Sequence, residues 1–346
     1  MSRLLTAVVL GGLSLPWSAM VQAAGDAHSR SKLLRGCGSC HVGHGKAGSK
    51  MLPEAEENFC FRCHGNASTR SQLIRQGLLA PMSNLRDVSR DFRQPHSHPI
   101  GRTGIHRANE QLPERDPRTP RHVECADCHK SHRTVRLQRT LRGRRITRRS
   151  PLDGRSPEYV LCYRCHSDSA NLPRGATNVR QRFSASNPSY HPVESIGPQT
   201  AYVPSLRAPL NTSSMISCGD CHGNDRGRGM HGSRYPFMLR LYYSTVPRTP
   251  ESPQAYALCY SCHDRQRLFS GRGFSEHERH VKRQSISCAV CHTGHGSTDY
   301  THLIQFSPTA TGPGVDPATR TRELRYVDKG RGAGECTVAC HGWRNN

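Results

Sequence analysis

The chain of 346 residues carries 49 lysines and arginines against 26 acidic residues, which gives a formal net charge of +23. Only 34% of its residues are hydrophobic and its mean hydropathy is −0.69, whereas ordinary globular domains are about 45–50% apolar. This composition excludes a conventional apolar core, because too little apolar surface is available to offset the chain entropy lost on folding.

Residues 1–24 have the pattern of a secretory signal peptide. Arg3 precedes an apolar run over residues 4–17, and small residues follow at Ala23 and Ala24. A membrane anchor is the weaker interpretation, because the run is too short to span a bilayer and contains glycine and proline. We therefore predict an exported domain over residues 25–346, without a transmembrane segment.

All sixteen cysteines fall into eight C-x-x-C-H motifs, of which the last has three residues between its cysteines. This motif is typical of c-type haem attachment, in which two thiols bond the haem vinyl groups and the adjacent histidine ligates iron. A disulfide framework or zinc sites would not explain a histidine after every second cysteine. In chain order the predicted sites are Cys37, Cys40 and His41; Cys60, Cys63 and His64; Cys125, Cys128 and His129; Cys162, Cys165 and His166; Cys218, Cys221 and His222; Cys259, Cys262 and His263; Cys288, Cys291 and His292; and Cys336, Cys340 and His341.

The motifs alternate between two kinds, which indicates an internal repeat of four two-haem units. One kind lies in polar sequence and is followed by a second histidine, whereas the other follows an apolar or aromatic lead-in such as residues 157–161. The lead-ins predict short helices that begin at a proline or an acidic residue. Elsewhere we expect loops, little or no sheet, and a core formed by the haems. The predicted units are residues 37–64, 125–166, 218–263 and 288–341.

The second histidine of a polar motif cannot complete the iron of its own motif. Histidines on opposite sides of one iron need Cα atoms about 13 Å apart, counting about 2 Å for each Fe–N bond. Three extended residues, the separation of His292 and His295, reach only about 10 Å. These two histidines are therefore predicted to bind different irons, and the same argument applies to His44 and His132.

Thirteen histidines lie outside the motifs, which is more than eight distal positions require, and methionine is scarce. We therefore predict bis-histidine ligation at all or nearly all haems. The residues favoured as distal ligands are His44, His98, His132, His191, His231, His280, His295 and His302. His28, His122 and His277 compete with His302 for the remaining positions, and His96 and His106 are expected in solvent-exposed loops.

The alternation resembles the doubled C-x-x-C-H family of multihaem cytochromes, as do the stretches at residues 97–101, 121–125, 191–193, 277–281 and 301–304. The resemblance implies an octahaem electron-transfer protein of the periplasm, the outer membrane or the cell exterior. In its motif pattern the chain is similar to family members associated with the outer-membrane electron conduits of metal-reducing bacteria. Its implied partners are periplasmic or outer-membrane cytochromes, including a porin–cytochrome complex.

Residues 133–149 hold eight arginines and no acidic residue. One interpretation is a solvated loop or one that covers haem propionates, which arginine binds in a bidentate manner. The other is a docking surface that attracts an acidic redox partner. A nucleic-acid partner is not expected, because the chain is exported and shows no interleaved aromatic residues.

Two further functions stay open at this point. An octahaem reductase for nitrite, hydroxylamine or a sulfur oxyanion would need one iron with an open position, for which the site at residues 336–341 is the best candidate. A subunit of a conductive filament would instead assemble with copies of itself. The favoured interpretation is an electron carrier, with no catalytic residues.

Overall fold

The computed structural model carries side chains and describes most of the chain beyond residue 27. The predicted signal peptide and His44 lie outside the described residues, as does the side chain of His341. The described residues are 28–43, 51–81, 85–101, 106, 110–116, 118, 120–132, 139–142, 145–148, 156–168, 171–197, 202–311, 314–315 and 322–341.

The described segments are mostly loop with short helices, as predicted, and none of these helices exceeds nine residues. None of them is long and apolar enough to cross a membrane. In chain order the helices are η1 (Gly36–Ser39), α1 (Glu56–His64), α2 (Ala67–Arg75), α3 (Ser89–Phe92), α4 (Cys125–Cys128), α5 (Glu158–His166), α6 (Val179–Phe183), α7 (Cys218–Cys221), η2 (Pro236–Met238), α8 (Ala257–Tyr260), α9 (Arg265–Leu268), η3 (Glu278–Arg283), α10 (Cys288–Cys291), α11 (Pro308–Thr311) and η4 (Ala339–His341).

The strands form small two-stranded antiparallel ladders. Two of these ladders connect distant parts of the chain, since β1 pairs with β5 and β4 pairs with β6. The others are local, and the ladder of β2 with β3 lies within the arginine-rich block. The strands are β1 (His96–Ser97), β2 (Arg139–Arg142), β3 (Arg145–Arg148), β4 (Ser189–Tyr190), β5 (Gly232–Ser233), β6 (Gly296–Ser297), β7 (Gly314–Val315), β8 (Arg322–Glu323), β9 (Arg325–Gly330) and β10 (Ala333–Thr337).

The two kinds of motif form two kinds of helix. The lead-in helices α1 and α5 contain their motifs and end at the motif histidine, and α5 begins directly after Pro157, as predicted. The polar motifs form the four-residue helices α4, α7 and α10, which begin at the first cysteine. In α4 and α7 an aspartate between the cysteines completes a capping box, which satisfies backbone donors of the first turn.

Two copies of one structural unit surround the long-range ladders. In one copy α3 leads into β1, which pairs with β5; in the other α6 leads into β4, which pairs with β6. Both ladders need glycine. A Cβ atom at Gly232 would collide with a backbone carbonyl oxygen of α3, and one at Gly296 would collide with a backbone carbonyl oxygen of α6. The unit thus brings segments together that are far apart in sequence.

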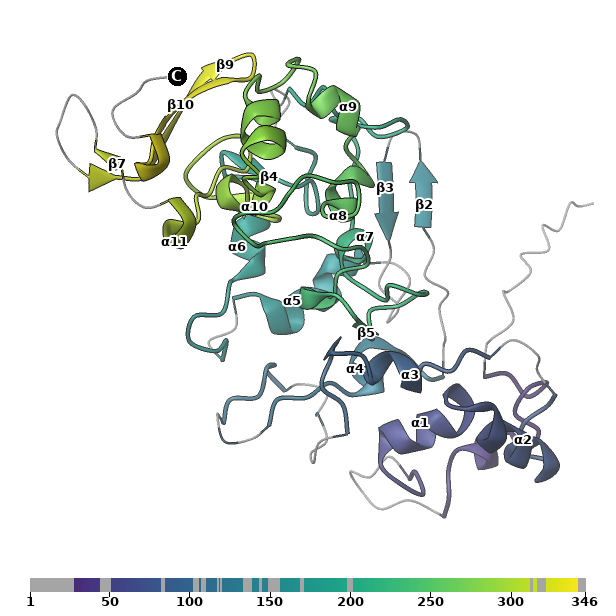
Figure 1. Cartoon of the computed structure of the whole chain (residues 1–346). Coiled ribbons are helices and arrows are strands. Elements are labelled where there is room, and N and C mark those ends of the chain that lie inside the picture. The colour runs from purple at the N-terminus through teal and green to yellow at the C-terminus, as the bar shows by residue number, and fades with distance from the viewer. Residues whose placement is uncertain are drawn as a thin grey trace, which may run out of the picture.

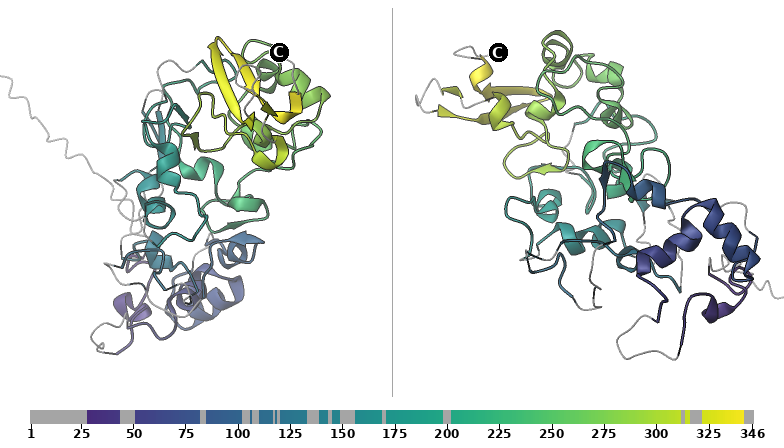
Figure 2. Two further views of the ribbon diagram at one scale, coloured as in Figure 1. Left: turned by 90° about the vertical axis from the view of Figure 1, so that its left-hand side faces the viewer. Right: turned by 60° about the horizontal axis from the view of Figure 1, so that its bottom comes forward.

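The first and the last described elements lie at opposite ends of the molecule. Figures 1 and 2 show α1 and α2 at one end and the ladder of β9 with β10 at the other. Among the described residues, buried apolar side chains form two small clusters, one around Tyr256 and Val281 and one around Ile304 and Phe306, and the remaining ones are scattered. These clusters are too small to serve as the core of a chain of this length.

Candidate haem-binding cavity

A continuous cavity of about 2390 Å³ runs between the motifs and is called the central cavity here. Its wall includes all sixteen cysteines and the motif histidines His41, His64, His129, His166, His222, His263 and His292. Leucine, valine, isoleucine and phenylalanine side chains fill much of the remaining wall. The chain is therefore built around an elongated space whose chemistry is that of its thiols, imidazoles and apolar side chains.

Motif histidines across this space face histidines from other segments. Two imidazoles that ligate one iron from opposite sides have ring centres roughly 6 Å apart, at about 2 Å for each Fe–N bond. Six pairs in the structure have ring centres 5.9–6.4 Å apart, so their separation fits an iron atom between them. The pairs are His28 with His64, His41 with His132, His98 with His166, His129 with His231, His222 with His295, and His277 with His292.

His263 of the sixth motif lies near His191. Burial lowers the pKa of His263 to about 4, and the neighbouring His191 is the next contribution. The Nδ1 atom of His263 is 2.9 Å from the Ser205 hydroxyl, which leaves its other ring nitrogen available. His191 therefore takes the position at the sixth motif that His98 takes at the fourth.

Hydrogen bonds fix which ring nitrogen of these histidines can bind a metal. The Nδ1 atoms of His98 and His191 lie 2.8 Å from the carbonyl oxygens of Met230 and Gly294. The Nδ1 atom of His28 lies 2.5 Å from the carbonyl oxygen of Ser131. A backbone carbonyl accepts from an N–H group, so each Nδ1 carries the proton and Nε2 is left as the ligand atom.

These carbonyl groups belong to the residues directly before His132, His231 and His295, which we call the downstream histidines. The backbone N–H groups of His98 and His191 donate to the carbonyls of His231 and His295 themselves. One short segment thus positions two imidazoles toward two different motifs, and the arrangement occurs three times along the chain.

The downstream histidines face motifs other than their own. His295 faces His222, whereas His292 of its own motif faces His277. In the same way His132 faces His41, and His231 faces His129. Phe183 packs on His295 at 5.2 Å between ring centres, as Phe92 packs on His231 at 5.1 Å. This geometry is what the reach argument requires.

Adjacent motifs also meet through their cysteines and acidic residues. The thiol of Cys60 hydrogen-bonds to Cys125, and this contact together with burial raises the pKa of Cys60. Equivalent thiol contacts join Cys162 to Cys218 and Cys259 to Cys288. Carboxylates strengthen two of these junctions, since Glu56 accepts from the N–H of Ala126 at 2.7 Å and Glu158 from that of Gly219 at 2.9 Å.

Burial lowers the pKa of several facing histidines, which favours the neutral form that iron ligation needs. Desolvation lowers the pKa of His129, His277 and His295 to about 4. The same cause lowers the pKa of His64 and His98. Neutral imidazole offers a lone pair to a metal, whereas imidazolium does not, so the buried histidines fit haem.

The structure places the remaining predicted ligands in different surroundings. His280 and His302 line the central cavity, but the Nε2 atom of His302 is 3.0 Å from an Asp328 carboxylate oxygen. The carbonyl of His302 accepts from Nδ1 of His292 just as that of Phe237 accepts from His222, so His302 is the structural counterpart of Phe237. An alignment of residues 232–240 with 296–305 contains this signal.

The structure changes the standing of three histidines. Two of them line the central cavity although the sequence favoured others, and the predicted solvent exposure of His106 is wrong. His28 and His277, which were alternatives, face motif histidines. His106 was expected in solvent, but its side chain is only 5% exposed because it packs among acidic residues and His122. His96 is half-buried in β1. Neither His106 nor His122 lines the central cavity.

Comparisons with known proteins agree with the motif pattern. The family model described as the doubled CXXCH motif matches residues 32–69 and 208–268, which contain the first, second, fifth and sixth motifs. No curated protein and no solved structure gives a significant match. In both matched segments a lead-in motif follows a polar one. In these two segments the chain is similar to the doubled-CXXCH family, whose motif is that of multihaem c-type cytochromes.

Proposed function

We propose that the protein is an exported octahaem cytochrome c that carries electrons along bis-histidine haems. The observation that carries the proposal is the pairing of motif histidines with second histidines, at a separation that fits iron, around one cavity. Haem c, when bound, supplies an iron that gains and loses one electron. Bis-histidine ligation favours low reduction potentials relative to histidine–methionine ligation.

The proposed distal ligands follow from the facing pairs. From the first motif to the seventh they are His132, His28, His231, His98, His295, His191 and His277. For the eighth motif His280 and His302 are the candidates, since both line the cavity. The contact of His302 with Asp328 favours His280, whose Nδ1 already lies 3.0 Å from the Glu276 carbonyl oxygen.

The arrangement suits transfer along the molecule better than chemistry at one iron. At the first seven motifs, protein imidazoles would occupy both sides of a bound iron, which would leave no coordination site for a substrate there. The downstream histidines link the first, third, fifth and seventh motifs into a row. Neighbouring cysteines place the second, fourth and sixth motifs beside that row.

Export and redox partners form part of the proposal. The signal-peptide pattern of residues 1–24 and the attachment motifs support assembly outside the cytoplasm, in the periplasm or beyond it. The net charge of +23 supports acidic partners, because a basic surface accelerates encounter with them. Periplasmic cytochromes and an outer-membrane porin–cytochrome complex are the proposed partners.

The decisive experiment is electron paramagnetic resonance of the oxidised protein, produced with haem-attachment machinery and with its haem content measured chemically. We expect eight haems per chain, all low-spin, and full reduction by dithionite without release of haem. A high-spin ferric signal equal to one haem, together with nitrite or hydroxylamine reduction, would instead make the protein a reductase. Fewer than eight attached haems would overturn the octahaem assignment.

A further inference from the structure

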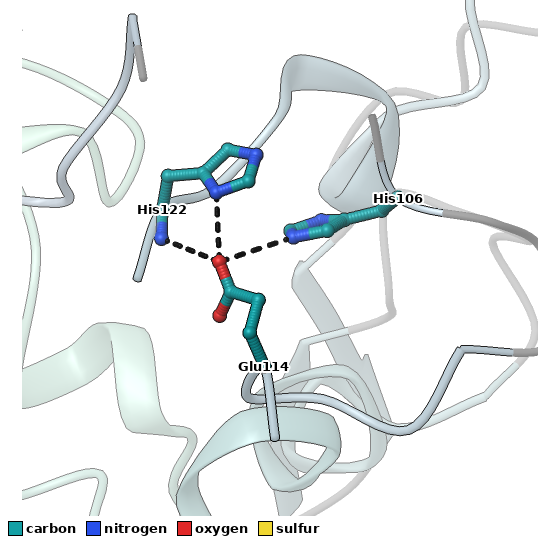
Figure 3. Close-up of side chains that lie close together, drawn as sticks. All are labelled: His106, Glu114 and His122. Atoms are coloured by element: carbon teal, nitrogen blue, oxygen red, sulfur yellow. Dashed lines mark hydrogen bonds and ion pairs between the residues drawn. The ribbon is translucent and has the colours of Figure 1, made fainter. Parts of the chain in front are cut away.

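A second group of buried histidines lies outside the central cavity. His106 and His122 converge on the carboxylate of Glu114, and the three ligand-type atoms lie within 4.8 Å of one another (Figure 3). The side chains of His106, Glu114 and His122 are 5%, 7% and 3% exposed. We call these three residues the His–Glu–His cluster.

The distances within the cluster are short. The Glu114 Oε1 atom is 2.7 Å from Nδ1 of His122 and 3.5 Å from Nε2 of His106. The ring centres of the two histidines are 4.3 Å apart. Among the described residues, the two ring nitrogens that face Glu114, Nε2 of His106 and Nδ1 of His122, are buried and make no hydrogen bond of ordinary geometry. Buried polar atoms without partners are costly, so a group that satisfies them stabilises the fold.

Asp127 orients His106 from the opposite side. Its Oδ2 atom is 2.7 Å from Nδ1 of His106, so this nitrogen carries the proton and Nε2 is directed toward Glu114. A carboxylate that accepts from the second nitrogen of a ligating histidine is the usual outer partner in protein zinc sites. Asp127 lies between the cysteines of the third motif, which anchors this outer partner to α4.

The local charge also favours a cation, in a chain that is otherwise strongly basic. Glu114 accepts from the backbone N–H of His122 at 3.0 Å as well as lying beside both imidazoles. Glu124 adds a further carboxylate, which accepts from the His106 backbone N–H at 3.1 Å. Three acidic side chains, those of Glu114, Glu124 and Asp127, thus surround the two imidazoles.

We propose that His106, Glu114 and His122 bind one divalent transition-metal ion, with zinc as the best-matched ion. Two imidazoles and one carboxylate are ligands that zinc commonly takes, with water in a fourth position. At about 2.0–2.2 Å from the metal, tetrahedral ligand atoms lie roughly 3.4 Å apart. The distance between His106 and Glu114 already meets this requirement. The shorter contact between His122 and Glu114 has to open by less than about 1 Å when the metal replaces a proton.

The test measures zinc in the haem-loaded, full-length protein. The protein is stripped with a chelator, incubated with zinc chloride, gel-filtered, and analysed for zinc and haem iron by mass spectrometry. We expect one zinc ion per chain. His106→Ala and Glu114→Gln should weaken zinc binding at least about tenfold, and Asp127→Asn by about 10- to 100-fold. His96→Gln removes a histidine outside the cluster and should bind zinc as the parent does.

Haem content, measured on every variant, separates loss of the metal from loss of the fold. Zinc-edge X-ray absorption of the parent protein provides a readout that needs no variant, and we expect scattering from two imidazoles. Absence of bound zinc, a spectrum without imidazole, or equal binding by His106→Ala would each overturn the proposal. Because zinc and haem iron are counted separately, failure of this site leaves the haem count and the proposed electron transfer to be judged on their own.

Discussion

Neighbouring histidines on one strand illustrate how little sequence proximity says about role. His96 and His98 are two residues apart, yet only His98 faces a motif histidine and directs Nδ1 to a backbone carbonyl. Pro99 follows His98 and keeps its backbone extended, so the side chain projects from the end of β1. Hydrogen bonds to Nδ1 therefore distinguish a ligand-type histidine such as His98 from its neighbour His96.

Removing His98 should affect one haem. In His98→Ala the iron bound by His166 would lose its second imidazole, so we expect a high-spin ferric signal from about one haem in eight. Paramagnetic resonance of the oxidised protein measures this change directly, and the total haem content should stay the same. His96→Ala is the matched control and should remain entirely low-spin. Identical spectra for the two variants would contradict the assignment of His98.

At the scale of elements, a two-residue ladder holds distant parts of the chain together. The ladder of β1 with β5 makes few hydrogen bonds, but it places His98 beside His231. Gly232 permits this pairing because the Asp91 carbonyl group occupies the space where a Cβ atom would lie. The same ladder positions ligands for two motifs, so local damage should spread to both.

Gly232→Ala should therefore destabilise the folded protein by about 1–3 kcal/mol, the usual cost of inserting a methyl group into a packed site. Denaturant unfolding of the haem-loaded protein measures this free energy. Gly197→Ala is a suitable comparison, because an added methyl group at Gly197 meets no protein atom within 4 Å. If both substitutions have the same effect, the close approach at Gly232 does not matter.

At the scale of the whole molecule, the chain encloses its cavity with few apolar contacts of its own. Among the described residues, some buried hydrophobic side chains form small clusters around Tyr256 and around Ile304, and the others are scattered along the chain. Packing of this extent cannot offset the conformational entropy of more than three hundred residues. Apolar groups from bound haem would supply the missing contacts.

The chain produced without haem attachment should consequently not fold. We expect it to be digested by a nonspecific protease at least about tenfold faster than the haem-loaded protein, because unfolded backbone is accessible along its whole length. Time courses of intact protein on gels provide the comparison, with circular dichroism as a second measure. A cooperative thermal transition in the haem-free chain would show that the polypeptide has a sufficient core.

Much of this arrangement was predictable where the chemistry is local. The cysteines predicted to attach haem are identified by spacing alone, and the structure places all of them at the central cavity. The helix over Glu158–His166 follows from Pro157 and the apolar lead-in. Which histidine meets which motif depends instead on long-range pairing, such as β4 with β6, that leaves no local trace. His302 was predicted as a distal ligand because it is a histidine outside the motifs. In the structural repeat it takes the position that Phe237 has in the other copy.

The burial of His106 could not be inferred for a related reason. Its partners Glu114 and Asp127 are separated from it in sequence by a proline-containing loop and by the segment that leads into the third motif. A histidine in polar sequence ordinarily indicates exposure. Only the folded chain brings the acidic residues around it.

The order in which facing histidines occur along the chain has a consequence for biogenesis. His41, His129 and His222 each meet a partner that is synthesised much later, namely His132, His231 and His295. An emerging chain can thus acquire a site's cysteines and first imidazole long before the second imidazole exists. Each newly made polar motif would supply the second imidazole of the previous polar motif while starting its own site. Maturation of these sites should therefore advance in steps from the N-terminus. A truncated chain should stop with its last sites half finished and the earlier ones complete.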